Sequence, residues 1–443
     1  MRIALIAMSG VRAHNQKLVE VGLTLPGFVE RSKVIASLPS LSLLTIAGLT
    51  PEDVEVTYHE IADIDAVAEL PHCDMAAVST FTAQAKEAYK LAARYRALGV
   101  PTVIGGLHAN AVPDDCARHF DAVVTGEGEL TWPTLVDDFR AGKMARVYSP
   151  DGRTFDLADG PMPRFDLLDV QRYNRMTVQT QRGCPWRCDF CAASIRIAPK
   201  YKVKPVAKVI AEIREIKRIW PKPFIEFADD NSFVNKAHSK ELMRALIPER
   251  VRWFTESDIA VADDDELLTL MRQAGCAQIL VGLESPNAAA LDGVEQLRNF
   301  KRDRLERYKE AIARIQSHGI SVNGCFVLGL DGDTTAIFED VFRFVEESGL
   351  TEVQITVMTA FPGTPLYARL WGEGRLIEPE AWEKCTLFDV NFTPRQMSVT
   401  ELEAGLVDLA KRLYTEERKK ARAAAFRGQH RRYLRSRRSE RAA

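Results

Sequence analysis

The sequence predicts an α/β fold: an N-terminal doubly wound parallel (Rossmann-like) sheet, then a partial (β/α)6 TIM barrel and a helical C-terminal region. Two observations predict it. Short β-rich runs alternate with helical runs in two series, and strands separated by helices require parallel crossover connections. The stretch between the series is rich in Asp, Pro and Gly, which is typical of a linker. The expected units are a Rossmann-like domain (1–150), a linker (151–174), a barrel (175–370) and a C-terminal region with a basic helical tail (371–443).

The first series contains five β-rich runs, at residues 2–8, 54–61, 75–81, 101–106 and 121–129. Residues 83–99 place alanine, leucine and tyrosine side chains on one helical face, and Gly99 ends that helix. Ligands bind doubly wound sheets at the carboxyl ends of the strands. The small residues at these ends are Ser79, Thr80, Gly105, Gly106, Gly126 and Gly128. Such residues allow a large ligand to approach the backbone, although tight βα turns would also use the glycines.

The second series contains six β-rich runs, at residues 175–181, 224–229, 251–257, 277–285, 321–330 and 352–361. The helical stretches between them are residues 206–219, 239–247, 264–275, 304–319 and 336–349. No sequence signal in this series indicates an antiparallel pair. Six β/α repeats therefore predict a barrel or partial barrel, with its chemistry at the carboxyl ends of the strands.

The composition is that of a globular protein without a membrane span. The chain is 46% hydrophobic and 27% charged, and no run of 18 apolar residues could cross a bilayer. The start of the sequence lacks the long apolar region of a signal peptide, so we expect a first strand there and a cytoplasmic protein.

The last 33 residues are strongly basic. Residues 411–443 hold 13 Lys and Arg against 3 Glu, a balance of +10, which leaves −12 for the rest of a chain whose net charge is −2. Such a tail could contact nucleic acid or anionic lipid. A solvated, partly helical terminus is the simpler interpretation.

Three of the eight cysteines lie together in QRGCPWRCDFCAAS (181–194), at Cys184, Cys188 and Cys191. The five scattered cysteines are expected to be buried small side chains. A loop after a strand can bring three thiolates to one metal centre. A structural zinc needs a fourth ligand, usually from a second pair, and residues 192–237 contain no Cys or His. A four-iron cluster bound by three thiolates would leave one iron open.

This motif resembles that of the radical S-adenosylmethionine (radical SAM) enzymes, C-x-x-x-C-x-aromatic-C after the first barrel strand, with Phe190 at the aromatic position. The resemblance implies a four-iron four-sulfur cluster and SAM as cofactors. In that family the amino and carboxylate groups of SAM chelate the fourth iron. Reductive cleavage of SAM then gives a 5′-deoxyadenosyl radical.

Residues at the ends of further strands match positions that contact SAM in this family. FADDNSF (227–233) offers Asp229 and Asp230 to the amino group of SAM, although capping of the next turn is an alternative role for both. VGLES (281–285) offers Glu284 and Ser285 as polar contacts to SAM. The fifth strand places Gly329 against the adenine, while FPGTPLY (361–367) is interpreted as backbone shaping.

The front domain resembles the cobalamin-binding domain of cobalamin-dependent radical SAM enzymes, through residues 38–49, 103–115 and 121–129. The resemblance implies that Ser79, Thr80, Gly105, Gly106 and Gly126 line the nucleotide tail of cobalamin. The D-x-H-x-x-G motif that supplies a cobalt ligand is absent, because His14 is accompanied by Arg12 and Lys17 in place of Asp and Gly. No histidine ligand is therefore expected, and a domain that has lost the cofactor remains an alternative.

The resulting hypothesis is an enzyme that uses the cluster, SAM and cobalamin to methylate or rearrange an unactivated carbon of a small molecule. The expected reducing partner is a flavodoxin or ferredoxin, and nucleic acid is not expected. Alternatives are a cobalamin-free radical SAM enzyme and a non-catalytic corrinoid or iron-sulfur sensor. A tRNA methylthiotransferase would need three further cluster cysteines in the front domain, which has only Cys73 and Cys116. Neither the substrate nor a catalytic side chain can be deduced.

Overall fold

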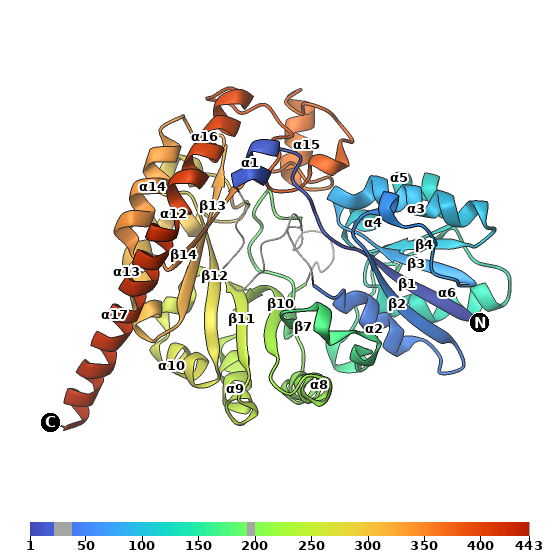
Figure 1. Cartoon of the computed structure of the whole chain (residues 1–443), viewed down its shortest axis with the longest axis horizontal. Coiled ribbons are helices and arrows are strands. Elements are labelled where there is room, and N and C mark those ends of the chain that lie inside the picture. The colour runs from blue at the N-terminus through green and yellow to red at the C-terminus, as the bar shows by residue number, and fades with distance from the viewer. Residues whose placement is uncertain (22–37, 193–199, 443) are drawn as a thin grey trace.

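The computed structural model describes residues 1–21, 38–192 and 200–442, with side chains to residue 435. It contains two six-stranded parallel sheets side by side (Figure 1). The first has the order β2-β1-β3-β4-β5-β6. Its strands are β1 (Arg2–Met8), β2 (Glu55–Ile61), β3 (Met75–Ser79), β4 (Thr102–Gly105), β5 (Ala122–Val124) and β6 (Val147–Tyr148). Its helices are α2 (Leu41–Leu49), α3 (Ala85–Ala97), α4 (Leu107–Ala111), α5 (Pro113–His119) and α6 (Trp132–Arg140). Helix α1 (Gln16–Val21) lies away from this sheet, and its Leu18 is part of the barrel core.

The second sheet is the partial barrel, with the order β14-β13-β12-β11-β10-β7. Its strands are β7 (Met176–Val178), β10 (Phe224–Ser232), β11 (Arg252–Ser257), β12 (Cys276–Glu284), β13 (Ser321–Leu328) and β14 (Glu352–Val357). Its covering helices are α8 (Val206–Ile219), α9 (Lys236–Leu246), α10 (Asp265–Gln273), α13 (Tyr308–Ser317), α14 (Ile337–Ser348) and α16 (Val399–Leu413). The predicted fold class is confirmed: a doubly wound parallel sheet precedes six parallel barrel strands.

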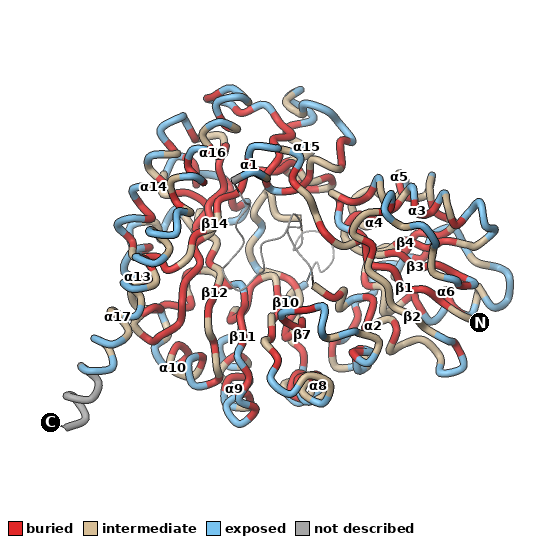
Figure 2. The backbone as a smooth tube through the Cα atoms, in the orientation of Figure 1, coloured by how far each residue is buried: buried red, intermediate tan, exposed pale blue. Residues whose placement is uncertain are grey.

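Successive side chains of each strand point to opposite faces of the sheet, as β12 shows. Ile279, Val281 and Leu283 of β12 face the helices and are fully buried. Gln278, Leu280, Gly282 and Glu284 lie on the other face, toward the barrel interior. Figure 2 shows the strands of both sheets mostly buried and the outer helices exposed along one side. The carboxyl ends of the barrel strands are thus held by a packed outer shell.

Three details differ from the sequence-based expectation. Residues 121–129 form a strand only over β5, because Gly126 takes a φ of +68° that a strand cannot continue through. A sixth strand, β6, completes the first sheet. An antiparallel pair, β8 (Gln181–Arg182) with β9 (Lys202–Val203), brackets the cysteine motif, although no antiparallel signal is visible in the sequence.

The segment between the two sheets contains three short 3₁₀ helices, η4 (Leu157–Asp159), η5 (Phe165–Leu167) and η6 (Val170–Arg172). Phe165 is buried in the barrel core, and the Tyr173 hydroxyl donates to Glu60 of β2 at 2.6 Å. This segment therefore packs against both sheets. The divisions at residues 150, 174 and 370 stay predictions.

The basic tail is a single helix, α17 (Glu416–Ala442), whose end extends beyond the body of the molecule (Figure 1). Its first half packs on α13, where Gln429 donates to the Ala313 carbonyl at 2.8 Å. The helical part of the expectation is confirmed. None of the helices in the described chain is both long and apolar enough to traverse a bilayer.

Candidate active site

The cysteine loop begins where β7 ends, and a buried carboxylate fixes its first residues. Asp229 of β10 accepts hydrogen bonds from the backbone N–H groups of Thr180 (2.8 Å) and Gln181 (3.1 Å). The hydroxyls of Thr180 and Ser232 donate to its other oxygen. These bonds satisfy a carboxylate that is only 4% exposed. Asp229 thus anchors the strand-to-loop turn, in keeping with its alternative role as a capping residue.

The two residues after Asp229 reach the loop closer to the first cysteine. Asp230 accepts from the Gly183 N–H at 2.9 Å, and the Asn231 amide donates to the Cys184 sulfur at 3.6 Å. The same amide donates to Asp258 at 2.9 Å, which also accepts from the Trp186 indole at 2.8 Å. Three consecutive side chains at the end of β10 therefore position this loop.

The far side of the loop is held by the segment after β12. Cys188 and Glu295 form an antiparallel bridge, and the Asp189 N–H donates to the Val294 carbonyl at 2.9 Å. The Glu295 carboxylate accepts from the Arg187 N–H at 3.3 Å. It also accepts from the Arg298 N–H at 2.6 Å. Contacts with other elements thus hold the loop at both of its ends.

The three motif cysteines are half-buried thiols that form no disulfide with one another. Burial raises the pKa of Cys184 to about 11 and that of Cys188 to about 12, and the neighbouring cysteines raise both further. Lys301 opposes this rise at Cys188. Thiols whose charges interact in this way share one small site, and metal binding would displace their protons.

Across the described residues, no three His, Cys, Asp or Glu side chains are placed to hold one metal ion. A cubane differs from a single ion, because each of the three thiolates binds a different iron. Ligands of a cubane therefore stand farther apart than ligands of a single zinc. The donor set, three thiols in one loop, fits a cluster that takes three of its ligands from this loop.

Glu284 ends β12 in the left-handed region, with a φ of +62°, and its carboxylate pairs with Lys301. Lys301 also donates to the Gly282 carbonyl at 2.8 Å. Burial lowers the pKa of this ammonium, but Glu284 and the thiol of Cys188 outweigh burial and raise it. The adjacent Ser285 is fully buried and accepts from the Asn287 N–H at 3.1 Å, so it shapes the following turn.

The remaining predicted SAM contacts lie on two other elements. Phe190 is half-buried and packs on the barrel core beside the cysteines. Gly329 follows β13 with a φ of +89°, and its N–H donates to Asp333 at 3.0 Å. A Cβ there would lie 2.8 Å from Leu402 of α16. Gly329 is thus required by local packing, whatever else it contacts.

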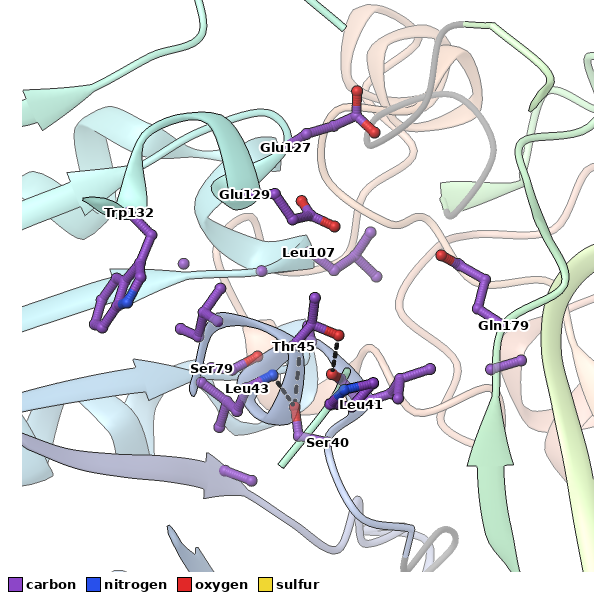
Figure 3. Close-up of a pocket in the computed structure, with 18 of the residues that line it drawn as sticks. Ser40, Leu41, Leu43, Thr45, Ser79, Leu107, Glu127, Glu129, Trp132 and Gln179 are labelled. Carbon is purple, nitrogen blue, oxygen red and sulfur yellow. Dashed lines mark hydrogen bonds between the residues drawn. The ribbon is translucent and has the colours of Figure 1, made fainter. Parts of the chain in front are cut away.

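A cavity of about 430 Å³ lies where the two sheets meet. All five residues predicted to contact cobalamin line it: Ser79, Thr80, Gly105, Gly106 and Gly126. The barrel side of the wall includes Gln179 and Arg182. Figure 3 shows Gln179 across the cavity from Leu107, Thr45 and Glu129 of the front domain. The strand ends of both sheets therefore open into one space.

Ion pairs close one edge of this cavity. Arg182 donates to Glu127 at 2.6 Å and to Glu129 at 2.7 Å, and Lys202 also pairs with Glu127. Burial raises the pKa of Glu127, but Lys202, the Phe155 N–H and Arg182 together hold it below its ordinary value. Because Arg182 lies two residues before Cys184, these pairs connect the front domain directly to the cysteine loop.

Sequence reasoning missed some of these residues and misjudged one. Asn231 lies inside a motif that was recognised, but its contact with Cys184 needs the fold. Lys301 and Arg182 had no signal beyond their charge. Cys325 was expected to be a buried apolar side chain and is instead half-exposed on the interior face of β13. The other four scattered cysteines are buried as expected.

Comparison with known proteins supports the two-domain interpretation. Residues 178–345 match the radical SAM superfamily, residues 33–136 match the B12 binding domain, and residues 364–442 match a domain of unknown function. Bacteriochlorophyllide d C-12(1)-methyltransferase of Chlorobaculum tepidum is 25% identical, over 84% of this chain and 82% of that protein. Hopanoid C-2 methylase of Rhodopseudomonas palustris is 28% identical, over 78% and 67%.

Among solved structures, the radical SAM methyltransferase TsrM from Kitasatospora setae, with cobalamin and a [4Fe-4S] cluster bound, shares the fold. Its TM-score is 0.68 at 16% identity, over 94% of this chain and 89% of that one. Three clustered thiols, a cavity between two sheets, and matches to both domains thus agree. The chain carries a B12 binding domain followed by a radical SAM domain, the pair of domains that cobalamin-dependent radical SAM enzymes have, and the cofactors of these two domains are a four-iron four-sulfur cluster, SAM and cobalamin.

Proposed function

We propose that the enzyme transfers a methyl group to an unactivated carbon of a small molecule. One observation supports this most: the cavity of the front domain is walled by Arg182, two residues from the first cluster cysteine. A methyl carrier in that cavity and a radical source at the cysteine loop would share one substrate. Relatives named for methylation of bacteriochlorophyllide and of hopanoids support the same reaction class.

Cys184, Cys188 and Cys191 would hold the cluster, with SAM on its open iron. When bound, the cluster and SAM supply a 5′-deoxyadenosyl radical, and cobalamin supplies the methyl carrier. The protein positions these groups and excludes water. Asn231 and Glu295 would orient the loop for the cluster, through the amide contact with Cys184 and the bridge to Cys188.

The proposed SAM contacts divide into positioning and binding residues. Asp229 affects SAM only by positioning the cysteine loop, because its carboxylate accepts hydrogen bonds from Thr180, Gln181 and Ser232. Asp230 and Glu284 each keep one carboxylate oxygen without a hydrogen bond to a described residue, so each can accept from an ammonium or hydroxyl of SAM. We also propose that Phe190, Ser285 and Gly329 contact SAM through van der Waals packing.

For cobalamin, we propose that Ser79, Thr80, Gly105, Gly106 and Gly126 surround the nucleotide tail. Gly106 has a φ of +90°, and a Cβ there would lie 2.9 Å from the Ser79 hydroxyl. Because residue 106 has no side chain, a ligand in the cavity can approach the backbone at this position. A flavodoxin or ferredoxin in the cytoplasm would supply the electron, in a compartment that keeps free thiols reduced.

The test is anaerobic reconstitution with iron, sulfide, cobalamin and reductant, followed by SAM carrying a deuterated methyl group and a small-molecule extract. We expect 5′-deoxyadenosine, and extract metabolites heavier by the labelled methyl. An intact cluster that yields no 5′-deoxyadenosine would favour a sensor. Turnover without bound corrinoid absorbance would favour a cobalamin-free enzyme.

A further inference from the structure

The C-terminal helix packs on the rest of the chain by one face. Arg422 of α17 is buried and donates to the Leu413 carbonyl at 2.9 Å. Seven residues on, Gln429 donates to α13, and four residues later the Tyr433 ring lies 4.8 Å from that of His318. Residues spaced by seven and four share one face of a helix. These contacts therefore fix which face of α17 points away from the body.

The outward face of α17 is a row of cations. Lys420, Arg427 and Arg431 have the same spacing of seven and four, and they lie about half a turn away from Arg422. All three side chains are exposed. Leu434, seven residues after Arg427, is 46% exposed on the same face. This face thus combines positive charges with one large apolar side chain that the fold leaves partly uncovered.

The positive charge of this helix is concentrated. Residues 418–439 contain ten Lys and Arg and no Asp or Glu, whereas residues 1–410 carry a net charge of −12. An ion pair with the body is formed at the start of the helix, where Arg418 pairs with Glu346. Within the described structure, the basic side chains of residues 423–432 form no ion pair. The acidic body therefore leaves most of the charge on the middle of α17 uncompensated.

An isolated exposed cation needs no partner, because water solvates it. A row of cations differs, since like charges one turn apart on a helix repel each other and their potentials add. Arg427 and Arg431 stand at that spacing. At physiological ionic strength this field extends about 8 Å, so an anionic surface must lie directly against the helix to be attracted strongly. Such a surface would relieve the repulsion along the row.

The length and position of α17 suit an extended partner. Its 27 residues span about 40 Å, and it runs along one edge of the molecule, with its end beyond the body (Figure 1). A row of charges on a rod at the outer edge can lie flat against a plane. A small anion would contact only one or two of these charges.

The side chains of α17 favour a bilayer over nucleic acid. Binding of single strands combines basic residues with aromatic rings that stack on the bases, whereas the Tyr433 ring is turned inward to His318. A helix that reads duplex DNA enters the major groove, whereas α17 has one face packed on α13. Leu434 beside the cations matches the headgroup layer of a membrane, where basic and apolar side chains of one helix bind together.

We propose that α17 binds the surface of an anionic phospholipid bilayer through Lys420, Arg427, Arg431 and Leu434. The three cations contact lipid phosphates, and Leu434 enters the headgroup layer. The contact is peripheral, and it brings the body of the enzyme to the membrane surface. It needs neither cofactor nor turnover, so its failure and the failure of the proposed reaction are seen separately.

The test is co-sedimentation of the full chain with vesicles at physiological ionic strength. The vesicles are pure phosphatidylcholine, or phosphatidylcholine and phosphatidylglycerol in equal parts, and we expect binding only to the second kind. Lys420→Gln/Arg427→Gln/Arg431→Gln should bind roughly a hundredfold more weakly, because each basic residue near an anionic surface contributes about fivefold. Leu434→Ser should weaken binding severalfold, since one apolar contact is lost.

The matched control is Lys90→Gln/Arg118→Gln/Lys143→Gln, which removes the same charge from exposed positions of the front domain. It should bind as the wild type does, which separates the location of the charge from the net charge. Arg427→Lys/Arg431→Lys keeps the charge and should retain binding, which separates charge from a folding defect.

Three results would overturn the inference. Anionic vesicles would sediment no more protein than neutral vesicles, or the two triple variants would bind alike. The third is that single-stranded RNA, added at a phosphate concentration equal to that of the anionic lipid, removes the protein from the vesicles. In that case α17 prefers nucleic acid to a bilayer.

Discussion

The cysteine loop of the barrel and the cavity of the front domain are built by opposite means. The loop is held by polar side chains from other elements, with Asp229, Asn231 and Glu295 each bonded to it. The cavity is lined by apolar side chains such as Leu107 and Trp132, and at the strand ends by residues with little or no side chain, such as Gly106 and Ser79. A cluster of small size needs thiols fixed in space, whereas a large cofactor needs room along a backbone.

The largest effect is expected from removing one thiol of the loop. Cys188→Ala should abolish 5′-deoxyadenosine formation and reduce bound iron, because two thiolates do not retain a cubane. Iron content and product chromatography after anaerobic reconstitution measure both. Cys73→Ala makes the same change at a buried cysteine of the front domain and should retain the cluster. Normal iron and product in Cys188→Ala would contradict the assignment.

Removing the anchor of the loop should have the next largest effect. Asp229→Ala leaves two backbone N–H groups and two hydroxyls without their acceptor, so we expect the free energy of unfolding to drop by about 2–4 kcal/mol. Iron retention should decrease in parallel. Denaturant unfolding and iron assay check this. If the protein stays stable while losing SAM affinity alone, Asp229 contacts SAM directly and does not act through the loop.

Breaking the connection between the two regions should have an intermediate effect. Arg182→Met leaves Glu129 without its ion pair and Glu127 with only Lys202 and the Phe155 N–H, which should cost about 1–3 kcal/mol of stability. Cobalamin affinity should decrease as well. The double variant with Glu129→Gln should recover part of the loss, since it removes the unpaired charge. Equal effects of the single and double variants would argue against coupling through this pair.

The smallest effect is expected from filling the wall of the cavity. Gly106→Ala places a Cβ 2.9 Å from the Ser79 hydroxyl at a φ of +90°. Gly142→Ala also places a Cβ at a positive φ, +64°, but meets no atom within 4 Å. Gly142→Ala should lose about 1 kcal/mol of stability, and Gly106→Ala should lose more, because its φ of +90° with a ψ of −163° is a region that only glycine readily adopts. Only Gly106→Ala should weaken cobalamin binding, measured by visible absorbance titration.

The sequence predicts the loop better than its surroundings. Cys184, Cys188 and Cys191 lie within eight residues of one another, so their spacing alone predicts a metal centre. The alternation of strands and helices likewise predicts both sheets, because apolar side chains recur with a different period in strands than in helices. Lys301 and Arg182 could not be deduced, since their partners come from other strands. Cys325 was misjudged because both faces of a barrel strand are covered, and the sequence does not show which face is the interior.

The central claim is that three thiols hold a cluster with one open iron where SAM binds. Mössbauer spectroscopy of the protein reconstituted with ⁵⁷Fe tests it directly, recorded before and after addition of SAM. The account predicts that one iron of the cluster differs from the other three, and that SAM shifts the signal of that iron alone. Four equivalent irons that do not respond to SAM, or a protein that takes up zinc and no cluster, would contradict it.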